Sequence, residues 1–197
     1  MKKFTSLSLT RYLAELSSKK PVPGGGSVSA YVAALGMGLT EMAAQIGMTR
    51  ADPSTQASIQ KTISLLRKAR KDTLQIVDLD PKVYLHVLKT YAKAKKISEK
   101  EKKNQLIDEA LENSFRLQAD LALLVTMAQG AARSLEGVIR GSISNDLRVS
   151  RSLLRAAFKG ACDTAEINRV TMKDPQKKER AGRALEEVKK RFETENV

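Results

Sequence analysis

The sequence contains few cysteines, histidines and aromatic residues, and each shortage excludes a class of site. Cys162 is the only cysteine and His86 the only histidine among 197 residues. An internal disulfide framework and a zinc site built on cysteines are therefore excluded, and no metal site is predicted. A Ser-His-Asp triad would depend on His86, and no G-x-S-x-G motif accompanies it. Aromatic residues make up 4% of the chain, so aliphatic side chains must fill the core, which favours closely packed helices.

Signals for membrane insertion or export are also missing. The residues after Lys2-Lys3 mix serine, threonine and arginine and form no hydrophobic signal region. The most apolar stretch, residues 28–48, is interrupted by Glu41 and Gln45, which indicates a buried helix rather than a membrane span. Because a single cysteine also suits a reducing compartment, we expect a cytoplasmic protein without a membrane partner.

Basic residues outnumber acidic ones by 35 to 22, which gives a net charge of +13. This charge fits an acidic partner, such as a nucleic acid, an anionic metabolite or a ribosomal surface, and equally fits a solvated cationic surface. The basic clusters at 67–71 and 177–180 lack the neighbouring aromatic side chains on which nucleic-acid bases stack. A nucleic acid is therefore the least favoured partner.

Apolar residues recur at helical spacing along most of the chain, and alternating β-branched runs are absent. Proline, glycine and capping residues separate six predicted helices, which span about residues 8–18, 27–49, 54–91, 98–139, 146–169 and 175–193. Ser27 is the predicted N-cap of the second helix, which is rich in small residues, and Ser98 with Glu101 has capping-box spacing. These elements predict a single all-α domain over residues 1–197: a multihelical antiparallel bundle with a central small-residue helix.

The loop Pro23-Gly24-Gly25-Gly26-Ser27 precedes that central helix. Its glycines allow backbone amides to approach a ligand, and the unpaired N–H groups of a helix start favour an anion. It is not a P-loop, because no Gly-Lys-Ser/Thr follows and no strand precedes it. A tight interhelical turn packed against a neighbour is the alternative interpretation.

Asp80 is the candidate acid–base residue. It lies on a stripe with alternating steps of three and four from Ile59 to Tyr91, so its carboxyl group is expected on a mainly apolar helix face. Burial there would raise the pKa of the carboxyl group into a working range. The alternative is an N-cap followed by Pro81 at the first helical position. Asp78, off the stripe, is expected to face solvent, and Asp146 has the alternative role of a helix N-terminal acid.

These features together resemble the cyclodeaminase/cyclohydrolase family, which includes the C-terminal domain of formiminotransferase-cyclodeaminase and stand-alone methenyltetrahydrofolate cyclohydrolases. The resemblance rests on Leu13-Ala14-Glu15-Leu16, on Pro21-x-Pro23 continuing through Gly24-Gly25-Gly26-Ser27-Val28, and on the small-residue helix ending in Glu41-Met42. Residues 77–84 are similar to a family pattern V-D-x-D-x-x-x-[FY], in which Asp80 takes the catalytic position. A second family stretch is kept in part by Ser144, Asp146-Leu147, Gly160-Ala161 and Asn168, and departures occur at Pro81, Gln118, Arg140, Asn145 and Thr164.

The resemblance implies a homodimeric enzyme that acts on the carbon between N5 and N10 of tetrahydrofolate, as a formiminotetrahydrofolate cyclodeaminase or a methenyltetrahydrofolate cyclohydrolase. It implies Asp80 as general base and acid and no cofactor beyond the tetrahydrofolate substrate. It also implies an anionic substrate tail, of one glutamate or polyglutamylated, that suits the net charge. The implied substrate-binding residues are Pro23, Gly24, Gly25, Gly26, Ser27, Asp146 and Asn168. Because of the departures, a catalytically impaired member that binds folate or a partner protein stays an alternative.

Overall fold

The computed structural model describes residues 3–49 and 51–196, and within them it contains helices and no strand. A short 3-10 helix, η1 (Phe4–Ser6), precedes six α-helices. Their bounds are α1 (Leu9–Leu16), α2 (Gly25–Met48), α3 (Pro53–Ala94), α4 (Lys100–Ser134), α5 (Ile143–Thr171) and α6 (Pro175–Asn196). The all-α fold predicted from the sequence is confirmed.

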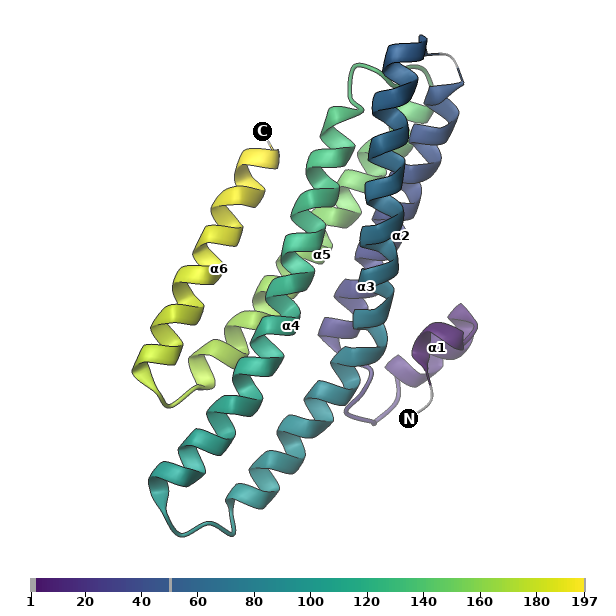
Figure 1. Cartoon of the computed structure of the whole chain (residues 1–197). Coiled ribbons are helices and arrows are strands. Elements are labelled where there is room, and N and C mark those ends of the chain that lie inside the picture. Colours follow the sequence, from purple (N-terminus) through teal and green to yellow (C-terminus); the bar gives the residue numbers. More distant parts are fainter. Residues whose placement is uncertain (1–2, 50, 197) are drawn as a thin grey trace.

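Helices α2 to α5 run up and down beside one another, and α6 covers the outer side of α4 (Figure 1). The central position belongs to α2, which packs along both α3 and α5. Small residues make this packing possible: a Cβ atom at Gly36 would lie 2.9 Å from Cγ of Leu154 and 3.2 Å from the Ser150 carbonyl oxygen. Ala30, Ala33 and Met37 are fully buried on the same helix. The predicted central small-residue helix is therefore confirmed.

The last helix is attached at both of its ends. Asp108 of α4, which is 2% exposed, accepts hydrogen bonds of 2.7 Å from the backbone N–H groups of Lys173 and Asp174, just before α6. Near the other end, the rings of Phe158 and Phe192 stack with their centroids 3.7 Å apart. No helix in the described part of the chain is long and apolar enough to cross a bilayer.

Two local expectations are wrong. The N-cap of α2 is Gly24, so Ser27 lies inside the helix, because its backbone N–H finds an acceptor on another helix. The cap of α4 is Glu99 without a side-chain hydrogen bond, so the capping box at Ser98 does not form. Helix α3 continues through Pro81 for more than three further turns to Ala94, in line with its predicted range, because a tertiary hydrogen bond replaces the one that the proline removes.

Candidate active site around Asp80

Asp80 lies inside α3 with a relative exposure of 9%, and two other helices donate hydrogen bonds to its carboxylate. The backbone N–H of Ser27, in the first turn of α2, donates to Oδ2 at 3.0 Å. The side-chain amide of Gln118, on α4, donates from Nε2 to Oδ1 at 2.7 Å. The N-cap alternative for Asp80 is excluded because the residue is in a helix interior. The buried face that the periodicity indicated is the one observed.

Burial raises the pKa of the Asp80 carboxyl group, because removal from water penalises the charged form. The hydrogen bonds from Ser27 and Gln118 act in the opposite direction and are outweighed. Burial also raises the pKa of the Tyr12 phenol, to which the nearby Asp80 charge adds. A carboxyl group with raised proton affinity, held by two donors, is suited to general acid–base catalysis.

Pro81, directly after Asp80, explains how α2 attaches to α3. In an α-helix the carbonyl of residue 77 accepts from the N–H of residue 81, and proline has none. The hydroxyl of Ser27 takes that place and donates to the Val77 carbonyl oxygen at 3.0 Å. Since its hydrogen is then used, Ser27 Oγ accepts from the Tyr12 hydroxyl at 3.2 Å. Tyr12, Ser27, Asp80 and Gln118, here called the Asp80 cluster, thus join α1, α2, α3 and α4.

Ser27→Ala is expected to lower the free energy of unfolding by about 1–3 kcal/mol, because the buried Val77 carbonyl loses its donor. Pro81→Ala supplies a backbone N–H to the same carbonyl. In the double variant the loss should therefore be smaller than the sum of the two single losses. Denaturant titration of the four proteins measures this coupling, and strictly additive losses would contradict the assignment.

Within the glycine-rich loop the residues have different surroundings. Pro23, Gly26 and Ser27 are buried, Gly24 is half-buried and Gly25 is exposed. A Cβ atom at Gly26 would lie 2.7 Å from Cγ of Asp80 and closer still to Oδ1 and to Nε2 of Gln118. Gly26 therefore allows the close approach of α2 to the cluster, as the packed-turn interpretation requires. Gly25 remains at the surface beside Thr164, the nearest atom to a Cβ placed there being Thr164 Oγ1 at 3.8 Å.

The two remaining candidates lie apart on α5. Asn168 is one turn beyond Thr164 and donates to the Thr164 carbonyl at 2.8 Å, so it lies toward the Asp80 end of the bundle. Asp146, in the first turn of α5, precedes Thr164 by eighteen residues, or about 27 Å of helix. Within one chain the structure does not bring Asp146 to Asp80. Arg140 lies near that far end too, in a small pocket with Ile46, Gly47 and Ile143.

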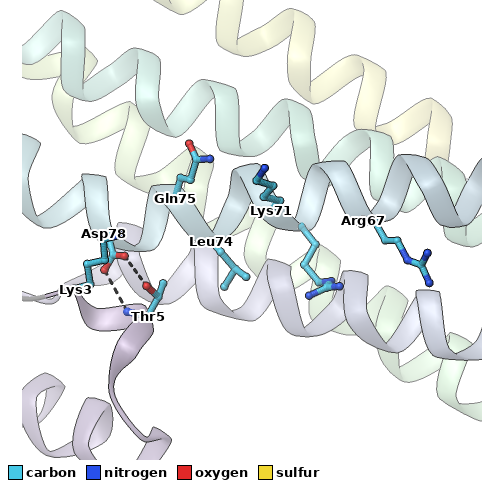
Figure 2. A pocket seen from close by; sticks show the side chains of 8 residues that line it. Lys3, Thr5, Arg67, Lys71, Leu74, Gln75 and Asp78 are labelled. Carbon is cyan, nitrogen blue, oxygen red and sulfur yellow. Dashed lines mark hydrogen bonds between the residues drawn. The ribbon is translucent and has the colours of Figure 1, made fainter.

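Asp78 is half-buried and not free in solvent, so the expectation of a solvent-facing acid is met only in part. Its carboxylate accepts hydrogen bonds from the backbone N–H of Phe4, and from the N–H and hydroxyl of Thr5, because η1 folds back onto α3. Figure 2 shows this contact at one end of a groove of about 310 Å³ along α3. The groove is lined by Lys3, Thr5, Arg67, Arg70, Lys71, Leu74, Gln75 and Asp78.

The guanidinium groups in this groove are partly neutralised. Glu41 of α2 is 6% exposed and accepts from Arg67 Nε at 2.7 Å and from Arg70 at 3.1 Å. The basic cluster expected to be a solvated helix face is thus in part an α2–α3 ion pair. Among the described residues, no group of three or more histidine, cysteine or acidic side chains is placed to hold a metal ion.

Sequence reasoning did not assign Tyr12 and Gln118 to the site. Tyr12 lies on the apolar stripe of α1 and resembles any core aromatic residue. Gln118 has the same signal as Asp80, because it is a polar residue on an apolar stripe that contains Leu111, Phe115 and Ala122, all of them buried. The stripe in α4 could have indicated Gln118, whereas no pattern distinguishes Tyr12.

Known proteins share features of this sequence and this fold. The family model described as formiminotransferase-cyclodeaminase matches residues 8–187. The formimidoyltransferase-cyclodeaminases of Rattus norvegicus and Mus musculus are each 27% identical over 175 residues, which cover 88% of this chain and 32% of the relative. The chain thus spans about a third of the length of these relatives.

A crystal structure of formiminotetrahydrofolate cyclodeaminase from Thermotoga maritima superposes with a TM-score of 0.85 at 22% sequence identity. The match covers 97% of this chain and 92% of that one, so the two proteins share one fold from end to end. With the family model covering nearly the whole sequence, this chain belongs to the formiminotransferase-cyclodeaminase family.

Proposed function

We propose that this protein is an enzyme of tetrahydrofolate one-carbon chemistry and acts as a formiminotetrahydrofolate cyclodeaminase. The observation that carries the proposal is the Asp80 carboxyl group, buried and held by α2 and α4. Burial raises the pKa of this carboxyl group, which favours its acceptance and return of a proton during the reaction. The family membership and the names of the relatives supply the substrate class.

In the proposed reaction, N10 of the substrate attacks the carbon of the protonated formimino group on N5. A new C–N bond forms, and the π electron pair of the C=N bond moves to the formimino nitrogen, which becomes an amino group. Asp80 takes the proton released from N10, which leaves a tetrahedral carbon bonded to N5, N10 and an amino group. The protonated Asp80 then returns the proton to that amino group, the C–N bond to it breaks, and ammonia leaves. The product is the cationic methenyl bridge, whose positive charge the regenerated carboxylate stabilises. The chemistry proposed for these residues uses no cofactor beyond the folate.

The test measures formation of the methenyl chromophore from formiminotetrahydrofolate by purified protein, with ammonia release as a second readout. Methenyltetrahydrofolate is offered separately, because a cyclohydrolase would add water to the same carbon. Turnover of the formimino substrate supports the proposal, and turnover of the methenyl compound alone would assign the cyclohydrolase. Folate-dependent thermal stabilisation without either turnover would instead indicate a binding protein.

We also propose that the protein works as a cytoplasmic homodimer. One side of α2 exposes large apolar side chains at helical spacing: Leu35 at 55%, Met42 at 39% and Ile46 at 43%. Leu35 and Met42 line an apolar groove of about 600 Å³ that Tyr31 and Leu153 also line. Because this face extends from the Asp80 end of the bundle toward the far end, a second copy packed antiparallel on it would bring its own Asp146 near Asp80. This dimer would explain how Asp146 could belong to the site, although it lies far from Asp80 within one chain.

Leu35→Glu is expected to halve the particle mass measured by light scattering and to lower turnover at least tenfold, since a charge would be buried at the centre of the interface. Leu65→Glu is the matched control, because Leu65 on α3 is similarly exposed, at 39%, and lies outside this face. A monomeric wild-type protein with full turnover would rule out the dimer proposal.

A further inference from the structure

The side-chain amide of Gln118 is fully buried, and only one of its two polar atoms makes a hydrogen bond. Its exposure is 0%, and Nε2 donates to Asp80 while Oε1 has no hydrogen-bond partner among the described residues. Buried amide oxygens are nearly always satisfied, and an exception needs a reason.

An amide differs from other neutral side chains because it holds a donor and an acceptor in one plane. Rotation by half a turn exchanges them in place. When Asp80 is a carboxylate, Nε2 of the amide donates a hydrogen bond to it. When Asp80 is a carboxylic acid, Oε1 of the turned amide would accept a hydrogen bond from the acid's O–H. A general base that becomes a general acid within one turnover presents both forms to its neighbour. The unpartnered Oε1 is the atom that the second form would use.

We propose that Gln118 is the positioning residue for proton transfer by Asp80, donating to the carboxylate and turning to accept from the acid. The proposal rests on the proposed function, in which Asp80 moves the proton. It assigns Gln118 no contact with the substrate. Its effect is to keep the carboxyl group in one orientation in both protonation states.

The other groups facing Asp80 do not offer this exchange. From α2, the Ser27 backbone N–H donates only. From α1, Tyr12 is the titratable neighbour, and its hydroxyl is bonded to Ser27 Oγ. On α3 itself, Asp78 is held by Thr5, and Lys82 is exposed. Gly26 packs against the amide so closely that a Cβ atom would collide with Nε2, so rotation in place is the movement that fits the space.

The experiment compares pH profiles of kcat/KM for the wild type and for Gln118→Met, which has similar length and neither donates nor accepts a strong hydrogen bond. The acidic limb of this profile is the pH range in which kcat/KM falls because the base becomes protonated. Loss of the hydrogen bond to the carboxylate destabilises the charged form, so the acidic limb should move up by about one pH unit. The value of kcat at the optimum should fall about tenfold with little change in KM, because only the proton transfer is affected. Gln118→Glu, which places a second carboxyl group beside Asp80, should move the limb further up.

The matched control is Gln129→Met. Gln129 is also a glutamine of α4 with 0% exposure, about 16 Å further along the helix, so it controls for the stability lost on removing a buried amide. Its acidic limb should coincide with that of the wild type. An unmoved limb in Gln118→Met, or an equal shift in Gln129→Met, would overturn the proposal.

A readout without turnover separates this proposal from the function itself. In protein labelled with 13C at aspartate carboxyl carbons, the Asp80 resonance is the one missing from Asp80→Asn. Its titration midpoint should rise in Gln118→Met by the same amount as the acidic limb. If the wild type turns over no folate and the midpoint still rises, the proposed function fails and the Gln118–Asp80 coupling stands. An unchanged midpoint removes the role of Gln118 whether or not the protein is active.

Discussion

Asp80→Asn is expected to lower kcat for formation of the methenyl product by about 10²- to 10⁴-fold, the usual contribution of a positioned acid–base group. Asparagine keeps the size of the side chain and one of its two acceptor oxygens but cannot take a proton from N10. The KM should change little, since the residue acts after the substrate is bound. Stopped-flow absorbance of the methenyl chromophore at several substrate concentrations measures both constants.

The same variant should remain folded, and the pH dependence of its stability distinguishes a loss of catalysis from a loss of structure. Because the pKa of Asp80 is raised in the folded state, the folded protein holds this proton more tightly than the unfolded chain, in which the pKa is about 3.9. The full contribution of Asp80 to stability is therefore present at pH below 3.9 and is lost as pH rises through the folded-state pKa. Asp80→Asn has no carboxyl group to ionise, so its stability does not fall in this way. At pH values above the folded-state pKa of Asp80, its melting temperature should equal or exceed that of the wild type.

Asp72→Asn is the control for this experiment, because Asp72 is a half-buried acid of the same helix outside the Asp80 cluster. It should retain wild-type kcat. Full activity of Asp80→Asn would remove Asp80 from the mechanism, and an unfolded Asp80→Asn would show that the carboxyl group is needed for structure instead.

The sequence predicted Asp80 because helical periodicity depends on the backbone alone. A stripe from Ile59 to Tyr91 places Asp80 on the buried face whatever packs against it, and α3 is continuous over that range. The residues of other helices that contact this face could not be predicted from periodicity. The residue that bonds to the Val77 carbonyl is Ser27, fifty residues earlier, and the sequence interpretation made the same serine a helix cap.

Local patterns failed where a tertiary contact replaced a local one. Asp78 has the spacing of a solvent-facing acid, yet η1 folds back and uses it as an acceptor. Pro81 has the pattern of a helix start, yet Ser27 supplies the missing donor and the helix continues. Asp146 and Asp80 were assigned to one site by family pattern, and helix length shows that one chain cannot join them. In each case the deciding partner is distant in sequence.

Gly26→Ala is expected to have the largest effect of any single methyl group added to α2. A Cβ atom at this position would lie 2.7 Å from Cγ of Asp80, a separation that real Cβ atoms do not adopt, and closer still to Nε2 of Gln118. Either α2 must move away from α3 or the carboxyl group must turn, and both changes break the bond from the Ser27 N–H to Oδ2. Such overpacking costs about 1–3 kcal/mol of stability.

The loss of activity in Gly26→Ala should exceed what that stability change explains. A displacement of about 1 Å between a catalytic group and its substrate lowers rates about 10²-fold, so kcat should fall by at least that factor in protein that is still folded. Gly182→Ala is the control, because it adds a methyl group inside another helix, α6, outside both the Asp80 cluster and the apolar face of α2. Its added Cβ would be 3.4 Å from Nη1 and 3.6 Å from Cδ of Arg169, the far end of a flexible side chain. Because alanine favours helix over glycine by up to about 1 kcal/mol, this control should be as stable as the wild type or more so. Calorimetry and single-turnover absorbance on the three proteins make the comparison, and equal activity of Gly26→Ala and Gly182→Ala would show that the approach of α2 to Asp80 does not matter for the reaction.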